Sequence, residues 1–598
     1  MTPTTLNELF FEATTRHAAQ SHALSRRGPD GQWHRIDHAT LRTRVQHVHA
    51  ALREAGLAAG DRVAILSENR PEWAITDYAC LAARCADVPV YPTLPAKQIE
   101  YILQDAGAKA IFVSNATQLA KVLEIRAELP ELRLVVLFEA GDLPEGVTGF
   151  ASFEAMGAAA AAKYPDWERE ARTVMPDDLA TLIYTSGTTG HPKGVMLTHG
   201  NITSNVVASL QVLDLRAGDS CLSFLPLSHI FERMVGHYTM LFAGASINYA
   251  TAFDTVVKEM GEVRPTVMAS VPRLYEKIYA AVTEKALNAG GAKRAIFEWA
   301  RATSDKRLDY VLNGRAVPPG IRVASALADR LVFRKLRGIM GGNLRFCVSG
   351  GAPLNPDICR FFIGAGLPCL EGYGLTETSP VITVNRMASI KPGTVGHPIP
   401  GVEVRIAEDG EILCRGPNVM RGYWHQPEAT AAVLDADGWF HTGDIGLIDA
   451  DGCLRITDRK KDIIVTAGGK NIAPQPIEAM LKTNKFFTNA VMIGDKRRFP
   501  AMLLVPNFDA LRHWAKVKGL PDLPPEELAA HPDAIDKLER EARKELRDLA
   551  QFETPKKFLV IPRDFTIDRG ELTPKLSVRR RNVEENYRAQ IEAMYADE

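Results

Sequence analysis

A loop rich in glycine and hydroxyl side chains lies in the stretch YTSGTTGHPKG, residues 184–194. It follows LATLIYT, an apolar run that predicts a strand, and its seven residues TSGTTGH carry two glycines and four hydroxyls. Glycine lets a backbone turn and bring its N–H groups close to a ligand. N–H groups and hydroxyls together form a cradle for anions, and Lys193 adds a positive charge. The loop therefore predicts a polyphosphate-binding site.

This loop differs from the Walker A phosphate loop, which needs a lysine followed by Ser or Thr after GxxxxG. Here Lys193 is followed by Gly194. A flexible surface turn is the alternative interpretation, but a turn requires neither four hydroxyls nor the PKG sequence. Phosphate binding is preferred for that reason.

Further candidate residues follow in chain order. Tyr373 between two glycines can offer its ring face to a flat ring, and Asp444 is a short hydrogen-bond acceptor. A carboxylate such as Glu377, close to a phosphate loop, suits Mg²⁺. Taken singly, each residue is better interpreted as a core tyrosine or a solvated turn, so the ordered set carries the argument. The motifs are SGGAP (349–353), EGYGLTET (371–378), HTGD (441–444), DRKKDIIVTAGGKN (458–471) and ELTPKLS (571–577).

Together these motifs resemble the adenylate-forming superfamily, which contains acyl-CoA synthetases, luciferases and the adenylation domains of peptide synthetases. The resemblance covers nearly the whole chain. It implies an α/β fold: a large N-terminal domain (1–457) of helix-covered, mostly parallel sheets plus a distorted β-barrel, and a smaller mobile α+β domain (463–598). Residues 458–462 would form the hinge linker between them.

The resemblance also assigns the nucleotide contacts. Adenine would lie on Tyr373 with 350–352 along its edge, and the ribose on Asp444 with Arg459 as its partner. The residues that it implies for ATP and AMP are Thr185, Ser186, Gly187, Thr188, Thr189, Gly190, Lys193, Gly350, Gly351, Ala352, Glu371, Gly372, Tyr373, Gly374, Thr376, Asp444, Ile456, Arg459 and Lys575.

Four residues are expected to act in the chemistry. The resemblance places Glu377 on Mg²⁺, with Thr185 as the second metal-side residue, and His229 beside the reacting carboxylate. Lys575 is assigned as the catalytic lysine of the adenylation step. Many relatives have that lysine just before an aliphatic and a basic residue. In this sequence Ser577 occupies that position, and Lys575 lies two residues earlier.

The change of texture at DRKKD marks a domain boundary. Lys461 matches the pivot position of the family, about which the C-terminal domain rotates between two reactions. In one pose the C-terminal lysine meets the phosphates. In the other, Gly468, Gly469 and Lys470 would shape a channel for the pantetheine of coenzyme A, where small residues fit a narrow wall.

The substrate class rests on PLSHIFER (226–233), which closely resembles the long-chain fatty acyl-CoA synthetases. The acyl pocket is expected at His229, Phe231 and Gly236. The stretch MLFAGASINYA (240–250) suits an aliphatic tail, and it is equally compatible with a core helix and strand. The helical segments after 272 and at 508–552 also look like the long-chain subgroup.

The expected reaction is ATP-dependent formation of acyl-AMP and then acyl-CoA from a long-chain fatty acid, with Mg²⁺, ATP and coenzyme A taking part. A fatty acyl-AMP ligase, which passes the adenylate to a carrier, stays open. A peptide-synthetase adenylation domain would be followed by a carrier domain, for which the chain leaves no room. A luciferase-like oxygenase is disfavoured by PLSHIFER, and a binding-only protein by the intact motifs.

The elements that must position these residues alternate between strands and helices, as in a helix-covered parallel sheet. Strands are predicted at 62–68, 108–114, 132–139, 263–272 and 344–353, with a long charged helical segment at 275–340. From about 390, Gly and Pro punctuation and short alternating runs indicate antiparallel strands. The N-terminus predicts a helix capped by Thr5, with Leu6, Leu9 and Phe10 on one face.

Composition limits the remaining classes. The 598 residues carry 71 Lys and Arg against 72 Asp and Glu, so a nucleic-acid partner is not expected. No run is long and apolar enough to span a membrane, no secretory signal is present, and the eight cysteines lack metal spacing. A cytoplasmic protein is expected, with peripheral contact to the inner membrane face through the N-terminal helix or the basic VRRR tail. A homodimer stays open.

Overall fold

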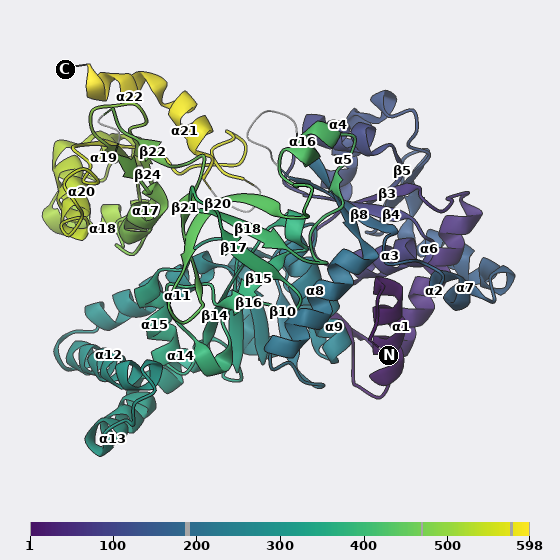
Figure 1. The fold of residues 1–598 in the computed structure, drawn as a ribbon, viewed down its shortest axis with the longest axis horizontal. Helices are drawn as coiled ribbons and strands as arrows, with labels where there is room; N and C mark the ends of the chain where they lie inside the picture. Colours follow the sequence, from purple (N-terminus) through teal and green to yellow (C-terminus); the bar gives the residue numbers. More distant parts are fainter. Residues whose placement is uncertain (1, 186–191, 468–469, 574–577, 597–598) are drawn as a thin grey trace.

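The structure is a computed structural model that describes residues 2–185, 192–467, 470–573 and 578–596. A large N-terminal body is followed by a smaller C-terminal unit at one side of the molecule (Figure 1). Both units mix helices and strands, as the sequence predicts.

The largest sheet has eight strands in the order β19-β9-β8-β4-β3-β5-β6-β7. The run from β8 to β7 is parallel, and β9 and β19 add antiparallel partners at one edge. The strands predicted at 62–68, 108–114 and 132–139 are all in it. Their bounds are β3 Arg62–Leu66, β4 Ala86–Val90, β5 Ala108–Val113, β6 Leu134–Leu137, β7 Thr148–Gly149, β8 Leu179–Thr185, β9 Lys193–Thr198 and β19 Gly422–Tyr423.

Helices cover this sheet and seal its apolar strands. The N-terminal helix α1 begins after Thr5, whose hydroxyl accepts from the Glu8 amide in a capping box, and it buries Leu6, Leu9 and Phe10. The other helices of this region are α2 His38–Glu54, α3 Pro71–Ala82, α4 Ala96–Ala106, α5 Ala116–Glu124, α6 Phe150–Ala160, α7 Trp167–Ala171 and α8 His199–Val212.

Two further sheets complete the core of the body. One has the order β12-β13-β14-β15-β16 and contains the strands predicted within 263–272 and 344–353; the other has the order β10-β11-β1-β2. Their bounds are β12 Val267–Ser270, β13 Phe346–Ser349, β14 Cys369–Gly374, β15 Val381–Val384 and β16 His397–Pro398, then β1 Leu24–Arg27, β2 Trp33–Ile36, β10 Ser220–Ser223 and β11 Ser246–Tyr249.

The segment between β12 and β13 forms a helical arm that extends away from the body (Figure 1). This confirms the helical segment predicted at 275–340. The inner face of α12 packs beside α15 Pro356–Gly364, where a Cβ at Gly364 would lie 2.1 Å from Ser304 Oγ. The arm consists of α11 Pro272–Asn288, α12 Gly291–Leu312, α13 Pro319–Ala328, the π-helix η5 Asp329–Phe333 and α14 Arg334–Ile339.

The antiparallel region predicted after residue 390 is built on a four-stranded sheet in the order β17-β18-β20-β21. It lies between the body and the C-terminal unit (Figure 1). Its strands are β17 Glu403–Ile406, β18 Glu411–Arg415, β20 Phe440–Ile448 and β21 Leu454–Arg459. The last two carry HTGD and the start of DRKKD.

The C-terminal unit has a three-stranded sheet, β24-β25-β26, and a two-stranded hairpin, β22-β23. Helices pack on the sheet and form its own apolar core. The strands are β22 Ile464–Val465, β23 Asn471–Ile472, β24 Phe487–Ile493, β25 Ala501–Pro506 and β26 Lys557–Val560. The helices are α17 Pro474–Lys482, α18 Phe508–Lys518, α19 Pro525–Ala530, α20 Pro532–Glu545, α21 Arg580–Asn586 and α22 Arg588–Tyr595.

Candidate active site

Asp444 and Arg459 face each other across two neighbouring strands. In the pair β20–β21 they are register partners, so the sheet itself brings carboxylate and guanidinium together. Arg459 Nε lies 3.4 Å from Asp444 Oδ1, and Tyr373 on β14 donates its hydroxyl to Asp444 Oδ2 at 2.6 Å. Burial raises the pKa of Asp444, and the Arg459 guanidinium opposes that rise. The three residues expected to hold adenine and ribose thus form one cluster.

Glu377 and Lys193 are linked through a residue that was not predicted, Tyr423. The Tyr423 hydroxyl donates to Glu377 Oε1 at 3.0 Å, and the Lys193 ammonium lies 4.9 Å from the centre of the Tyr423 ring. Among the described residues, none forms a hydrogen bond with Glu377 Oε2. One carboxylate oxygen is therefore held in place while the other keeps its capacity for a cation.

The predicted phosphate loop lies between β8 and β9, which pair as an antiparallel hairpin. Thr185 ends β8, Lys193 begins β9, and the two are register partners. Strand β19 pairs with β9, and Trp424, the residue after β19, donates its backbone N–H to the Gly194 carbonyl at 2.7 Å. The predicted loop residues Ser186, Gly187, Thr188, Thr189 and Gly190 lie outside the described residues.

The SGGAP loop meets the acyl-side motif directly. A Cβ at Gly350 would lie 2.9 Å from the Phe231 ring, so only glycine leaves that ring its place. Gly351 has φ +81°, in the left-handed region that favours glycine. His229 Nδ1 accepts from the Phe231 backbone N–H at 2.9 Å, which orients the imidazole. Gly350, Phe231 and His229 therefore lie together, and their roles in the adenylate and acyl subsites stay predictions.

The remaining predicted residues of this half surround Tyr373. Gly374 admits no side chain, because a Cβ would lie 1.8 Å from the Pro380 carbonyl oxygen. Glu371, two residues earlier on β14, accepts a hydrogen bond from the Gly393 N–H at 3.4 Å, and burial raises its pKa to about 7. Gly372 lies between Glu371 and Tyr373 on β14, and Thr376 is buried at the start of a 3₁₀ turn. Ile456 lies on β21 opposite Gly446, and Ala352 is exposed after β13.

The PLSHIFER motif leads into a buried π-helix, η3 Glu232–Tyr238. A Cβ at Gly236 would lie 2.5 Å from Glu232 Oε1, so the space beside Gly236 is filled by that carboxyl. The role of Gly236 in the acyl pocket stays a prediction. Burial without a charged partner raises the pKa of Glu232 to about 8. The stretch at 240–250 forms core, with Met240, Leu241, Ile247 and Tyr249 all buried.

A buried ion cluster, here the Arg233 cluster, anchors this π-helix to the main sheet. Arg233 donates to Asp77 on α3 at 2.5 Å, to Asp87 on β4 at 2.8 Å and to Thr181 on β8 at 2.9 Å. Tyr238 donates to Asp77 at 2.7 Å. All five side chains are buried. The cluster joins the acyl-side helix to β8, the strand that leads into the phosphate loop.

The linker 458–462 is held firmly on its N-terminal side. Lys460 pairs with Asp409 at 2.6 Å and Glu411 at 2.9 Å, and its N–H bonds the Gly443 carbonyl. Lys461 is the next residue. Partial burial lowers its pKa, as does Arg459, while Asp462, Asp444 and Glu377 act in the opposite sense. Lys461 is thus the first residue after Lys460, which is held by the body. The carboxylates of Asp444 and Glu377 influence the pKa of the Lys461 side chain.

In the C-terminal unit, Leu572, which comes shortly before Lys575 in the chain, faces the body. Leu572 and Val578 form an antiparallel bridge, and Leu572 lines a cavity of about 530 Å³ together with Thr93 and Arg273 of the body. Lys575 itself, with 574–577, lies outside the described residues.

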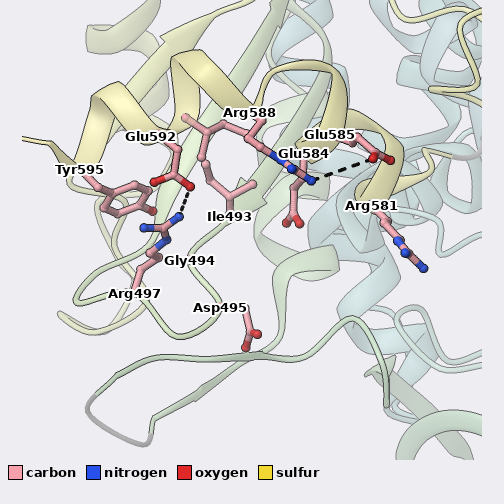
Figure 2. A pocket seen from close by; sticks show the side chains of 11 residues that line it. Ile493, Gly494, Asp495, Arg497, Arg581, Glu584, Glu585, Arg588, Glu592 and Tyr595 are labelled. Carbon is pink, nitrogen blue, oxygen red and sulfur yellow. Dashed lines mark hydrogen bonds and ion pairs between the residues drawn. The ribbon is translucent and has the colours of Figure 1, made fainter.

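The residues predicted to line the coenzyme A channel lie between β22 and β23 of the same unit. The Ala467 N–H bonds the Arg497 carbonyl at 2.8 Å, and the Lys470 ammonium lies 5.9 Å from the centre of the Phe552 ring. Gly468 and Gly469 lie outside the described residues. Figure 2 shows the neighbouring cavity of about 340 Å³, where Arg497 pairs with Glu592 and Arg588 with Glu585. These two arginines and two glutamates therefore already have partners within the C-terminal unit.

The donor set fits a magnesium ion carried in by the nucleotide. Within the described residues, no three His, Cys, Asp or Glu side chains stand close enough to hold a metal by themselves. Glu377 with its unpartnered oxygen is one carboxylate close to a phosphate loop, which is what Mg²⁺ needs when phosphate oxygens supply the other ligands. All eight cysteines are buried and free, as predicted for core thiols.

Comparison with known proteins identifies the family. The model of the AMP-binding enzymes matches residues 10–424, and that of the AMP-binding enzyme C-terminal domain matches residues 461–598. The chain belongs to the AMP-binding enzyme family. Among solved structures, the adenylation and carrier didomain of a carboxylic acid reductase from Segniliparus rugosus matches with a TM-score of 0.78 at 20% identity, over 100% of this chain and 83% of the other. That likeness supports the fold.

Curated relatives match over nearly the full chain. A long-chain-fatty-acid–CoA ligase, FadD15, of Mycobacterium bovis is 38% identical over 95% of this chain and 94% of the relative. The peroxisomal long chain acyl-CoA synthetase 7 of Arabidopsis thaliana is 33% identical over 99% and 86%, and the human long-chain-fatty-acid–CoA ligase 1 is 31% identical over 96% and 84%. The subgroup expected from PLSHIFER is therefore the one found.

Proposed function

We propose that this chain activates a long-chain fatty acid with ATP, first to acyl-AMP with release of pyrophosphate, then to acyl-CoA with release of AMP. The observations that support the proposal are two contact groups, Tyr373 with Asp444 and Arg459 and Tyr423 with Glu377 and Lys193, together with the contact of the Phe231 ring with Gly350. The relatives named as long-chain-fatty-acid–CoA ligases supply the substrate class.

In the first step, a carboxylate oxygen of the fatty acid attacks the α-phosphorus of ATP and the bond to pyrophosphate breaks. Asp444 accepts the ribose hydroxyls, and Tyr373 offers its ring to adenine. Lys193 and Lys575 neutralise charge that develops on phosphate oxygens. When bound, Mg²⁺ supplies further positive charge there, and Glu377 with the Thr185 hydroxyl would hold it.

In the second step, the thiol of coenzyme A attacks the acyl carbon and AMP leaves. His229 lies next to Phe231 and would border the reacting carbonyl. The C-terminal unit (463–598) would rotate about Lys461, withdraw Lys575 and bring 468–470 to the site. The body up to 457 would stay fixed, since Lys460 is anchored to its sheet.

Peripheral membrane contact is also proposed, since the fatty acid substrate partitions into bilayers. None of the helices in the described ranges has both the length and the apolar character of a membrane span. The N-terminal helix was the wrong segment to expect at a membrane, because its apolar face is buried. Arg580 of the VRRR tail already has a partner within the protein, since it pairs with Glu478 at 2.7 Å.

The test uses purified protein with palmitate, Mg·ATP and coenzyme A. The proposal predicts steady AMP release only when coenzyme A is present, together with palmitoyl-CoA. Steady release without coenzyme A, or acyl-AMP that coenzyme A does not consume, would favour the fatty acyl-AMP ligase instead.

Lys575→Ala sharpens this test by separating the two steps. We expect acyl-AMP formation to fall by at least two orders of magnitude, because a charge that stabilises the transition state is lost. Supplied acyl-AMP should still react with coenzyme A at nearly the normal rate. Equal loss of both steps would contradict the assignment of Lys575 to adenylation.

A further inference from the structure

The helical arm carries a charge that the whole chain does not have. Over residues 291–339 there are eleven Lys and Arg against four Asp and Glu, whereas the complete chain has a net charge of −1. Positive charge is therefore concentrated on one projecting element, which extends away from the body below the C-terminal unit in this view (Figure 1).

The outer surface of α13, η5 and α14 also carries exposed apolar side chains, three at a four-residue spacing and a fourth eight residues further along the chain. Val323, Leu327, Leu331 and Ile339 are 72%, 50%, 41% and 42% exposed. A four-residue spacing keeps side chains on one face of a helix. Large apolar side chains aligned on a solvent-facing stripe are unusual for a monomer and mark a surface that contacts something apolar.

A basic stripe runs directly beside the apolar one. Arg322, Arg330 and Arg334 each precede or follow the apolar positions by one to three residues. Lys335 adds a positive charge within the apolar row itself, four residues after Leu331 and four before Ile339. All four are exposed. Within the described ranges, no ion pair or side-chain hydrogen bond engages Arg322, Arg330 or Lys335. The nearby Asp329 is already paired with Arg337 at 2.5 Å.

We infer that this surface, the arm stripe of Val323, Leu327, Leu331 and Ile339 with its basic border, docks the protein on an anionic membrane surface. An apolar stripe bordered by Lys and Arg is the pattern of a helix that lies in the plane of the lipid headgroups. The basic side chains meet anionic headgroups while the apolar ones enter the acyl boundary. This deepens the proposed membrane contact and assigns it to a segment.

Other occupants fit the surface less well. A second copy would bring two positively charged arms together, and like charges oppose that contact. A nucleic acid would meet the basic side chains but offers no partner for Leu327 and Leu331. A membrane satisfies both stripes at once, and it also holds the fatty acid that the proposed reaction consumes.

The experiment measures sedimentation of the full-length protein with vesicles, without substrates. Vesicles of phosphatidylcholine alone are compared with vesicles that also contain phosphatidylglycerol. Two variants are tested: Val323→Ser with Leu327→Ser and Leu331→Ser, and Arg322→Glu with Arg330→Glu. The matched control is Lys516→Glu with Val517→Ser, an exposed basic and apolar pair on α18 of the C-terminal unit.

We expect the wild type to bind the anionic vesicles, and either arm variant to bind at least about tenfold more weakly, since each basic residue near an anionic surface contributes about fivefold. The control should bind like the wild type. Detergent-dispersed fatty acid should be converted normally by all variants, which shows that they fold.

Three results would overturn the inference. Failure of the wild type to bind anionic vesicles would remove the membrane contact itself. Normal binding by both arm variants would remove only the arm stripe. A change in the size of the free protein on substitution of the stripe, with vesicle binding intact, would make a second copy the occupant. None of these outcomes would touch the acyl-CoA reaction, which is measured separately.

Discussion

Two polar clusters in the body differ in what their side chains contact. In the Arg233 cluster, five buried side chains are bonded mainly to one another. In the cluster of Tyr373, Asp444 and Arg459, and in the neighbouring Glu377 group, acceptor oxygens remain for a ligand. Buried charges are stable only when paired, so the first cluster holds elements together. The second keeps capacity for substrate, which suits a site of chemistry.

The largest effect expected from this comparison is on activity. Glu377→Gln keeps the shape but removes the charge expected to hold Mg²⁺. Acyl-AMP formation should fall by about three orders of magnitude, since metal charge stabilisation is worth several kcal/mol. The measurement is pyrophosphate release, and the thermal midpoint should match the wild type. Normal pyrophosphate release by a folded variant would show that Glu377 does not belong to the side chains that act on the substrate.

A substitution in the Arg233 cluster should have the opposite effect: it should lower the stability of the body. Arg233→Met leaves two buried carboxylates without their partner, so the body should lose about 3–5 kcal/mol of stability. The measurement is urea unfolding without ligands. Arg216→Met, which removes an exposed pair with Asp214, is the control and should cause no resolvable change. A loss of catalysis without loss of stability would place Arg233 among the substrate contacts.

Glu232 sharpens the comparison through pH. Its pKa is raised to about 8 by burial, so the folded state holds a proton that the unfolded state releases at ordinary acidic pH. Its contribution is fully present at acidic pH and is lost as pH rises through about 8. Glu232→Gln should therefore gain stability over the wild type by about 1 kcal/mol per pH unit between pH 5 and 8. Urea midpoints at pH 5 and 8 check this, and an unchanged difference would contradict it.

The motifs grouped Tyr373, Asp444 and Arg459 correctly as neighbours because these residues lie on regular strands. Asp444 and Arg459 become neighbours through strand register alone, and Tyr373 follows from β14. Tyr423 was missed, since one aromatic residue in RGYW looks like any core tyrosine. Asp77 and Asp87 were missed because they lie 156 and 146 residues from Arg233 in sequence. No local pattern reports such a distance.

The arm illustrates a different limit. Its charged helical character is visible in the sequence, but periodicity does not tell which face packs and which stays exposed. Phe333 and Leu336 are buried, while Leu331, two residues before Phe333, is exposed. The membrane contact was expected at the N-terminal helix for the same reason: its amphipathic pattern predicts a buried face as well as a lipid-facing one.

The central claim is that one site carries out two reactions as the C-terminal unit changes its pose about Lys461. Lys461→Pro fixes φ near −65° at the first residue past the anchored Lys460. In single-turnover experiments, acyl-AMP formation without coenzyme A should remain near normal, and consumption of that acyl-AMP after coenzyme A is added should slow strongly. An unchanged second step would contradict the account, because it would mean that the two reactions need no rotation at this linker.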